Sequence, residues 1–340
     1  MARELDCIEL LPGRSGCFED AWLCPYDRRA PLAPEQAAAL RWLTSASLPI
    51  IELEEAKAAR AAFEALSVTL DGTRAADSTF RRKRAVFHHA LEYAVELGEL
   101  SANPLDRVNW KPAKISGEVE RRVVVNPAQA RELLVAVTYV GRTRGAMLAG
   151  MFACMYFAGL RPAEAAGLRE KDCHLPESGW GLLTLEETRP ESGRRFSDSG
   201  RTHDVRGLKQ RRRKAIRDVP IPPELVRILR EHLERHGTAA DGRLFLTATG
   251  GVFSTTAYGK VWKEARTYAL TPEQVASPLA GRPYDLRHAA VSLWLNSGVP
   301  APDVAERAGH SVDVLLRVYA KCVDGQREIA NQRIEGALAP

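Results

Sequence analysis

The chain has 340 residues, and because a single hydrophobic core stops growing at roughly 250–300 residues, this length predicts two domains. With 45% apolar and 27% charged residues, the composition is that of a globular protein and excludes a fibrous or wholly disordered chain. The net charge of +5 is a small average, so its meaning depends on where the basic residues gather.

The first 35 residues contain several Pro and Gly, and we expect an irregular segment at 1–35. They begin with charged residues and no apolar run, unlike a signal peptide. The longest uncharged stretch, 145–160, has 16 residues, fewer than the about 20 that span a bilayer, so we expect no membrane contact. Six cysteines without paired or C-x-x-C spacing predict a reduced, cytoplasmic protein with no metal site: Cys7, Cys17, Cys24, Cys154, Cys173 and Cys322.

Residues 36–110 are predicted to form a helical domain, with helices over 34–43 and 52–66. A third helix follows the capping residues Asp77 to Thr79, and its apolar side chains recur at spacings of seven and four residues: Phe80, Phe87, Leu91 and Val95. Its first turns carry four adjacent cations, although mutual repulsion and the helix dipole disfavour them there. A phosphate contact and a solvated face are therefore equally reasonable interpretations of Arg81, Arg82, Lys83 and Arg84.

A linker is expected at 111–122, then a second domain at 123–323 and a helical tail at 324–340. Asn126 and Pro127 begin a helix that runs to about Val137, and a buried helix follows at 146–158. Segments 180–186 and 215–221 are predicted to pair as strands. Further helices are expected at 223–236, 255–269, 285–296, 302–308 and 311–321. The predicted fold class is mainly α with a small antiparallel β-sheet (α+β).

The densest charge lies between the two predicted strands. Residues 188–217 (the basic hairpin) hold eleven Lys and Arg against three Asp and Glu, a net charge of +8 that leaves −3 for the other 310 residues. Such a cluster repels itself unless an anion is present, and a polyanion is the natural partner. A localisation signal or disordered tail is the alternative, which the position between two strands disfavours. We predict that nucleic acid binds this hairpin, including its run Arg211, Arg212, Arg213 and Lys214.

Two short segments combine residue types that suit phosphate chemistry. Gly159-Leu160-Arg161-Pro162 ends the buried helix and opens a new one that contains Glu164, so Arg161 stands at a helix N-terminus, which favours anions. The second segment is Tyr284-Asp285-Leu286-Arg287-His288, followed by Gly309-His310-Ser311 and Tyr319. In this order, and with the basic hairpin, the segments resemble the tyrosine recombinase family, which includes the phage-type integrases. The resemblance implies a helical core-binding domain followed by a tyrosine-recombinase catalytic domain.

The resemblance also implies roles for single residues. Arg161 and Arg287 match the arginines that clamp the scissile phosphate, and Tyr319 matches the nucleophile. His310 matches the histidine that hydrogen-bonds a non-bridging oxygen. Glu164 matches the acidic residue that supports the site.

Two assignments are less direct. Lys209 matches the hairpin lysine that protonates the leaving oxygen, with Lys214 as the alternative. Tyr284 stands where the family usually has a histidine, and since a phenol is a poorer proton acceptor than imidazole at neutral pH, the general base stays open. We assign His288 to the supporting residues.

These residue types fit a phosphodiester whose negative charge becomes more concentrated as a tyrosine oxygen attacks it. Each of two guanidiniums can donate two hydrogen bonds to the phosphate oxygens and so stabilise their charge. We therefore expect no metal and no cofactor. The resemblance implies a 3′-phosphotyrosine and a free 5′-hydroxyl, with rejoining that needs no ATP.

The resemblance further implies double-stranded DNA attachment sites as substrate, a homotetramer on DNA, an accessory directionality factor and a mobile element as the source of the gene. It implies a cytoplasmic, nucleoid-associated location. Two alternatives stay open: a catalytically inactive DNA-binding relative, and an enzyme like the type IB topoisomerases.

Overall fold

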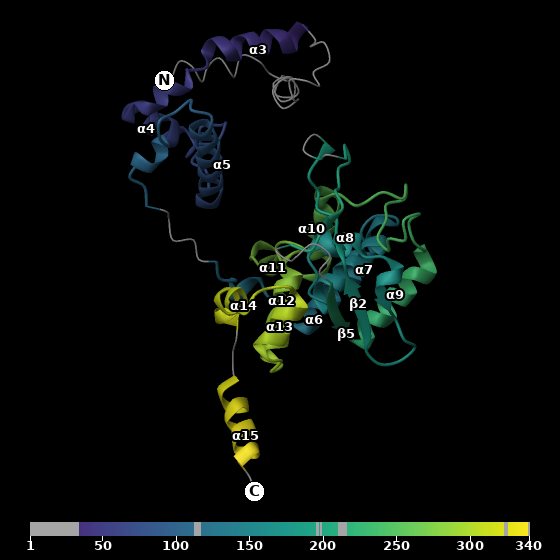
Figure 1. The fold of residues 1–340 in the computed structure, drawn as a ribbon. Coiled ribbons are helices and arrows are strands. Elements are labelled where there is room, and N and C mark those ends of the chain that lie inside the picture. The colour runs from purple at the N-terminus through teal and green to yellow at the C-terminus, as the bar shows by residue number, and fades with distance from the viewer. Residues whose placement is uncertain are drawn as a thin grey trace. The chain divides into compact units, whose positions relative to one another are not determined.

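The computed structural model describes residues 34–111, 117–194, 197, 199–209, 216–322 and 326–338. The chain divides into two compact units, Met1–Ser116 and Gly117–Pro340. Each unit has its own elements (Figure 1). The expected irregular segment at 1–35, the cysteines Cys7, Cys17 and Cys24, and the cations Arg211 to Lys214 lie outside the described residues, apart from Pro34 and Glu35.

The described part of the first unit is helical. Its elements are α3 (Pro34–Ala46), η2 (Ile50–Glu54), α4 (Ala56–Ala65), α5 (Asp77–Glu96) and η3 (Pro104–Arg107). Leu91 and Phe63 are buried where α5 meets α4, and Phe80, Phe87 and Val95 pack against them. The seven-and-four spacing on α5 therefore marks its core face, as the sequence predicts.

The second unit combines helices with two small antiparallel sheets, which confirms the predicted fold class. Its helices are η4 (Arg121–Val123), α6 (Pro127–Thr138), α7 (Arg144–Phe157), α8 (Pro162–Gly167), η5 (Glu170–Asp172), α9 (Pro223–His236), α10 (Thr255–Ala269), α11 (Pro272–Ala276), α12 (Asp285–Asn296), α13 (Ala301–Ala308), α14 (Val312–Tyr319), η7 (Ala320–Cys322) and α15 (Gln326–Leu338).

Three strands, β1 (Cys173–His174), β2 (Gly181–Leu185) and β5 (Arg217–Ile221), form one sheet in the order β1-β2-β5. β2 and β5 pair antiparallel with Leu183 opposite Val219, as predicted for the strands that flank the basic hairpin. Within that hairpin, β3 (Glu187–Thr188) and β4 (Arg206–Gly207) form a second pair.

Two apolar clusters hold the second unit together. In the larger one α7 supplies Met151, Phe152 and Met155, which are completely buried, and the indole of Trp262 on α10 packs 5.0 Å from the Phe152 ring. The smaller cluster joins α12, α13 and α14, and it includes Tyr319. Tyr319 is thus held by the packing that joins α12, α13 and α14, which are labelled in Figure 1.

Three predicted boundaries are wrong in detail. The helix predicted at 52–66 starts at Ala56, because Glu55 is extended and separates α4 from η2. Asp77 lies inside the first turn of α5, whose N-cap is Ala76 without a side-chain cap. The sequence predicts that this helix ends at Asn103-Pro104, but α5 ends at Glu96, before Gly98 with its positive φ of 75°, and Asn103 caps η3. Among the described residues, no helix is long and apolar enough to cross a membrane.

Candidate active site

Arg161 is held at the N-terminus of α8 by two contacts with Glu164. The Arg161 backbone N–H donates to Glu164 Oε2 at 2.8 Å, and Arg161 Nη1 donates to Oε1 at 2.8 Å. Pro162 occupies the first helical position, where its missing N–H has no partner to lose. The Arg161 side chain keeps 18% of its surface exposed, so it is the part of this group that a ligand can reach.

Glu164 is completely buried and also receives both terminal nitrogens of Arg217, at 2.9 and 2.8 Å. Arg287 Nη1 lies 3.9 Å from the same carboxylate. Burial alone would raise the pKa of Glu164, but the guanidiniums of Arg217, Arg287 and Arg161 outweigh it and lower that pKa to about 2. One carboxylate therefore neutralises part of a cluster of three cations, and the excess positive charge suits an anion.

Arg217 was not among the predicted site residues. It is the first residue of β5, in which inward and outward side chains alternate, and it shares the buried face with Val219 and Ile221. The strand period was thus the signal that could have found it. An arginine on the inner face of a strand needs a buried anion, which Glu164 supplies.

Arg287, near the start of α12, is completely buried. Its terminal nitrogens donate to the carbonyls of Gly159 and Ala308, which follow or end the helices α7 and α13. Carbonyls at helix C-termini carry partial negative charge and are therefore suited to hold a cation. The chain turns sharply after each of these two helices, at Gly159 and Gly309. Their φ angles of 59° and 63° lie in the left-handed region that favours glycine.

His310 and Tyr319 complete the group. Arg287 Nη2 lies 2.9 Å from His310 Nε2, and the His310 ring is 6.1 Å from the Tyr319 ring. Burial and the nearby arginines lower the pKa of His310 to about 3, so this imidazole is neutral at neutral pH. The structure therefore brings Arg161, Glu164, Arg287, His310 and Tyr319 together from four separate segments of the chain.

His288 and Tyr284 lie beside the phenol. His288 Nδ1 is 2.9 Å from Tyr319 Oη. The Tyr284 ring packs edge-on against His288 with centroids 5.0 Å apart. Tyr319 is 1% exposed, and burial raises the pKa of its hydroxyl.

Lys209 is not brought into contact with this group. It is exposed just after β4, and among the described residues it makes no hydrogen bond or ion pair with the members of this group.

The described part of the basic hairpin is nevertheless held to the rest of the second unit by two contacts. Arg189 pairs with Asp241 at 2.9 Å, and the backbone N–H of Thr255 donates to Glu191 at 2.7 Å.

The four cations of α5 differ in their exposure, since Lys83 and Arg84 are half-buried. Lys83 Nζ donates to the Val68 carbonyl at 2.7 Å, and the Arg84 guanidinium lies 5.0 Å from the Trp110 ring, so both have structural contacts. Arg81 and Arg82 are exposed.

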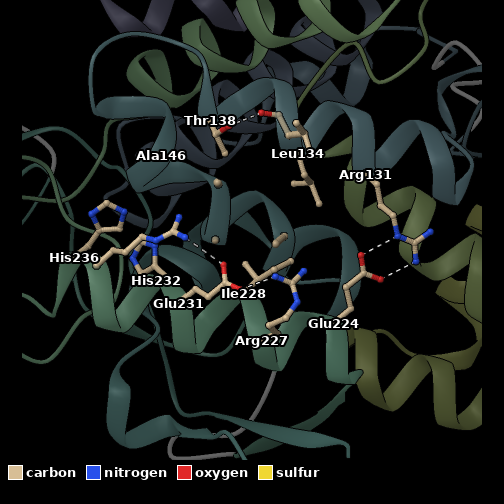
Figure 2. Close-up of a pocket in the computed structure, with 15 residues that line it drawn as sticks. Arg131, Leu134, Thr138, Ala146, Glu224, Arg227, Ile228, Glu231, His232 and His236 are labelled. Atoms are coloured by element: carbon tan, nitrogen blue, oxygen red, sulfur yellow. Dashed lines mark hydrogen bonds and ion pairs between the residues drawn. The ribbon is translucent and has the colours of Figure 1, made fainter. Parts of the chain in front are cut away.

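Two further features lie apart from the candidate site. His88, Glu92 and Asp106 in the first unit lie close enough to share a cation, but His88 already hydrogen-bonds Asp106 at 3.1 Å and Asn103 donates to Glu92 at 2.6 Å. In the second unit, a cavity of about 520 Å³ opens between α6, α7 and α9, with the Arg131–Glu224 pair at its edge (Figure 2). None of the candidate site residues lines it.

Comparisons with known proteins show which family and fold the chain resembles. The sequence profile of the phage integrase family matches residues 124–324. A tyrosine recombinase XerC-like protein of Caldanaerobacter subterraneus subsp. tengcongensis is 24% identical over 251 residues, which cover 69% of this chain and 60% of that protein. The chain thus spans less than two thirds of that relative's length.

Solved structures show the same fold. The integrase of the Tn1549 transposon, in complex with transposon right end DNA, aligns with a TM-score of 0.60 at 16% sequence identity. The alignment covers 95% of this chain and 99% of the integrase chain. The XerH site-specific recombinase, bound to a palindromic difH substrate, aligns with a TM-score of 0.54 at 18% sequence identity. The alignment covers 90% of this chain and 78% of the XerH chain.

Proposed function

The chain belongs to the phage integrase family, and from this premise we propose that it is a site-specific recombinase that cleaves and rejoins DNA strands. Cleavage proceeds through attack of Tyr319 on a backbone phosphate. It leaves a 3′-phosphotyrosine and a free 5′-hydroxyl, whose return attack rejoins a strand without ATP.

The observation that carries this proposal is the shared carboxylate of Glu164. It orients Arg161 directly and lies 3.9 Å from Arg287, which in turn lies 2.9 Å from His310. Two guanidiniums and an imidazole are thus linked through Glu164, and the His310 ring lies 6.1 Å from the Tyr319 ring. Donors fixed in this way before the reaction stabilise the charge that develops on the phosphate oxygens. Two fixed guanidiniums stabilise this charge without a metal or a cofactor.

DNA contacts come from both units. The basic hairpin supplies the density of positive charge, and Lys209 within it protonates the leaving 5′-oxygen, with Lys214 as the alternative. In the first unit, at 36–110, the exposed Arg81 and Arg82 contact phosphates. This unit serves as the core-binding domain, 111–122 as the linker and 123–323 as the catalytic domain. The substrate is double-stranded DNA, and the similar structures support a DNA substrate because the Tn1549 integrase is in complex with transposon right end DNA and XerH is bound to a difH substrate.

The active assembly is a homotetramer on two attachment sites. The tail at 324–340 includes α15, whose Ile334 and Leu338 are 57% and 78% exposed and are therefore available to a neighbouring copy. An accessory directionality factor selects integration or excision. The gene belongs to a mobile element, and the protein acts on nucleoid DNA in the cytoplasm.

The test is the capture of a covalent protein–DNA adduct. The full chain is incubated with a pool of nicked duplexes that tile the DNA on both sides of its gene. When the nick lies beside the cleavage site, cleavage releases a short 5′-hydroxyl fragment that diffuses away. Without this fragment the strand cannot be rejoined, so the phosphotyrosine adduct accumulates. We expect an adduct from the unmodified protein, and none from the Tyr319→Phe variant despite unchanged DNA binding.

The matched control is Tyr139→Phe, because Tyr139 is 73% exposed and lies after α6. This variant should form as much adduct as the unmodified chain. DNA binding without any adduct would identify an inactive relative instead. Relaxation of supercoiled plasmids that lack the flanking DNA would identify a topoisomerase.

A further inference from the structure

The hydroxyl of Tyr319 has one nitrogen within hydrogen-bonding distance among the described residues, and it belongs to His288. The distance between Tyr319 Oη and His288 Nδ1 is 2.9 Å, and the two ring centroids are 5.7 Å apart. His288 is fixed by α12, whose neighbours Leu286, Ala289 and Ala290 are buried. The contact therefore joins two packed helices, α12 and α14.

Among the described residues, neither of the two other candidates for a proton acceptor makes a hydrogen bond to Tyr319. His310 directs Nε2 to Arg287 at 2.9 Å, so this nitrogen is already a partner of a cation. The Tyr284 ring packs edge-on against His288, with the two ring centroids 5.0 Å apart. Among the described residues, its hydroxyl makes no hydrogen bond to Tyr319.

We propose that His288 is the proton acceptor for Tyr319, in the role that Tyr284 leaves open. The proposal rests on the recombinase function above. As Tyr319 Oη forms its bond to phosphorus, the phenolic proton passes to His288 Nδ1, and the bond from phosphorus to the 5′-oxygen breaks. The leaving oxygen takes its proton from the general acid, Lys209. On rejoining, the 5′-hydroxyl returns that proton, and the phenolate takes its own back from His288.

The surroundings keep this imidazole unprotonated at neutral pH, which is the form that can accept a proton, although the lowered pKa also makes it a weaker base. Burial, Arg282 and Arg287 lower the pKa of His288 to about 4, although Asp285 opposes them, so the ring is neutral at pH 7. The other titratable groups that face it are Tyr284 from its own segment and Tyr319 from α14, with His310 behind the phenol. Since burial raises the pKa of Tyr319, the phenol does not ionise unaided at neutral pH and needs an acceptor.

The test measures the single-turnover rate of adduct formation at several pH values, on the nicked duplex that forms an adduct with the unmodified chain. Asn is the informative substitution, because its Oδ1 can stand near the place of Nδ1 and accept the hydrogen bond but cannot take the proton. For the unmodified chain we expect a rate that is flat between pH 5.5 and 8. For His288→Asn we expect a loss of about 10²-fold at pH 7, and a rate that rises tenfold per pH unit as hydroxide replaces the lost base.

Two further variants complete the design. Tyr284→Phe should lose less than tenfold and keep the flat profile. His236→Phe, at the end of α9 (Figure 2), should match the unmodified chain. A flat profile for His288→Asn, or the tenfold slope for Tyr284→Phe instead, overturns the inference. If the unmodified chain forms no adduct at all, it is the recombinase proposal that fails.

Discussion

Arg217 and Glu164 form a two-point ion pair with both side chains withdrawn from solvent, 1% and 0% exposed. The arginine comes from β5, where the basic hairpin ends, and the glutamate from the first turn of α8, which begins at the proposed phosphate clamp. The pair thus connects the hairpin strand to Arg161. It also leaves three guanidiniums around one carboxylate, which is a stable arrangement only while every partner stays in place.

Arg217→Met should destabilise the protein by about 3–5 kcal/mol, because it removes both hydrogen bonds that the buried Glu164 carboxylate receives from β5. Glu164→Gln combined with Arg217→Met should not recover that loss, since Arg161 and the buried Arg287 then lose the carboxylate that they share. Urea unfolding measures both. The control is Arg131→Met, which breaks a two-point Arg–Glu pair of the same kind at an exposed site (Figure 2) and should cost less than about 1 kcal/mol. Equal losses for Arg217→Met and Arg131→Met would refute the argument.

Much of the fold and of the site follows from local signals in the sequence. The capping box at Asn126 and Gln129 marks the start of α6, and the alternation at β2 and β5 marks the sheet. Arg217 escaped notice because it lies in a run of cations that all suit DNA. The alternation of β5 places Arg217 on its buried face, but only the three-dimensional structure shows that Glu164 is its partner. His288 was predicted as a supporting residue, and its contact with Tyr319 could not be read from the sequence because the two positions are 31 residues apart.

Gly309→Ala should reduce both stability and adduct formation. A Cβ at this position would lie 2.2 Å from Arg217 Nη1 and 3.3 Å from Arg161 Nη1, so both guanidiniums must shift. The positive φ of 63° adds strain of about 1 kcal/mol. Gly250→Ala separates the two effects, because Gly250 has a φ of 78° but nothing within 4 Å of its added Cβ. Gly250→Ala should lose stability only, measured by thermal unfolding. If Gly309→Ala formed adduct at the normal rate, the clamp would tolerate displacement and this argument would fail.

The folded protein should lose stability as the pH falls below 6.5. His288 and His310 have pKa values lowered to about 4 and 3, from an ordinary value of 6.5. Between these values the unfolded chain binds the protons and the folded chain does not, so the free energy of unfolding falls with pH, by up to about 1.4 kcal/mol per pH unit for each histidine. Glu164 extends the loss below pH 4.5, because it stays ionised in the folded state down to about 2.

Urea unfolding at pH 5, 6, 7 and 8 measures this dependence. His310→Asn should make it shallower, since one of the two titrating rings is gone and His288 remains. His89→Asn should leave it unchanged, because His89 is exposed on α5. A dependence that persists undiminished in His310→Asn and in His288→Asn would show that other groups cause it.

Lys209→Ala should slow cleavage of an ordinary phosphodiester by about 10²-fold or more, because the leaving 5′-oxygen then lacks its acid. A substrate with sulfur in place of that 5′-oxygen releases a thiolate, which is a far weaker base and needs no proton. On this substrate Lys209→Ala should cleave within a few fold of the unmodified chain, whereas Arg287→Lys should stay slow on both because its defect lies in the clamp. Lys214→Ala is the matched control, with weaker DNA binding and a smaller salt dependence but normal cleavage once bound. If the sulfur substrate rescues Lys214→Ala instead, the acid is Lys214, and the exposed Lys209 after β4 contributes only charge.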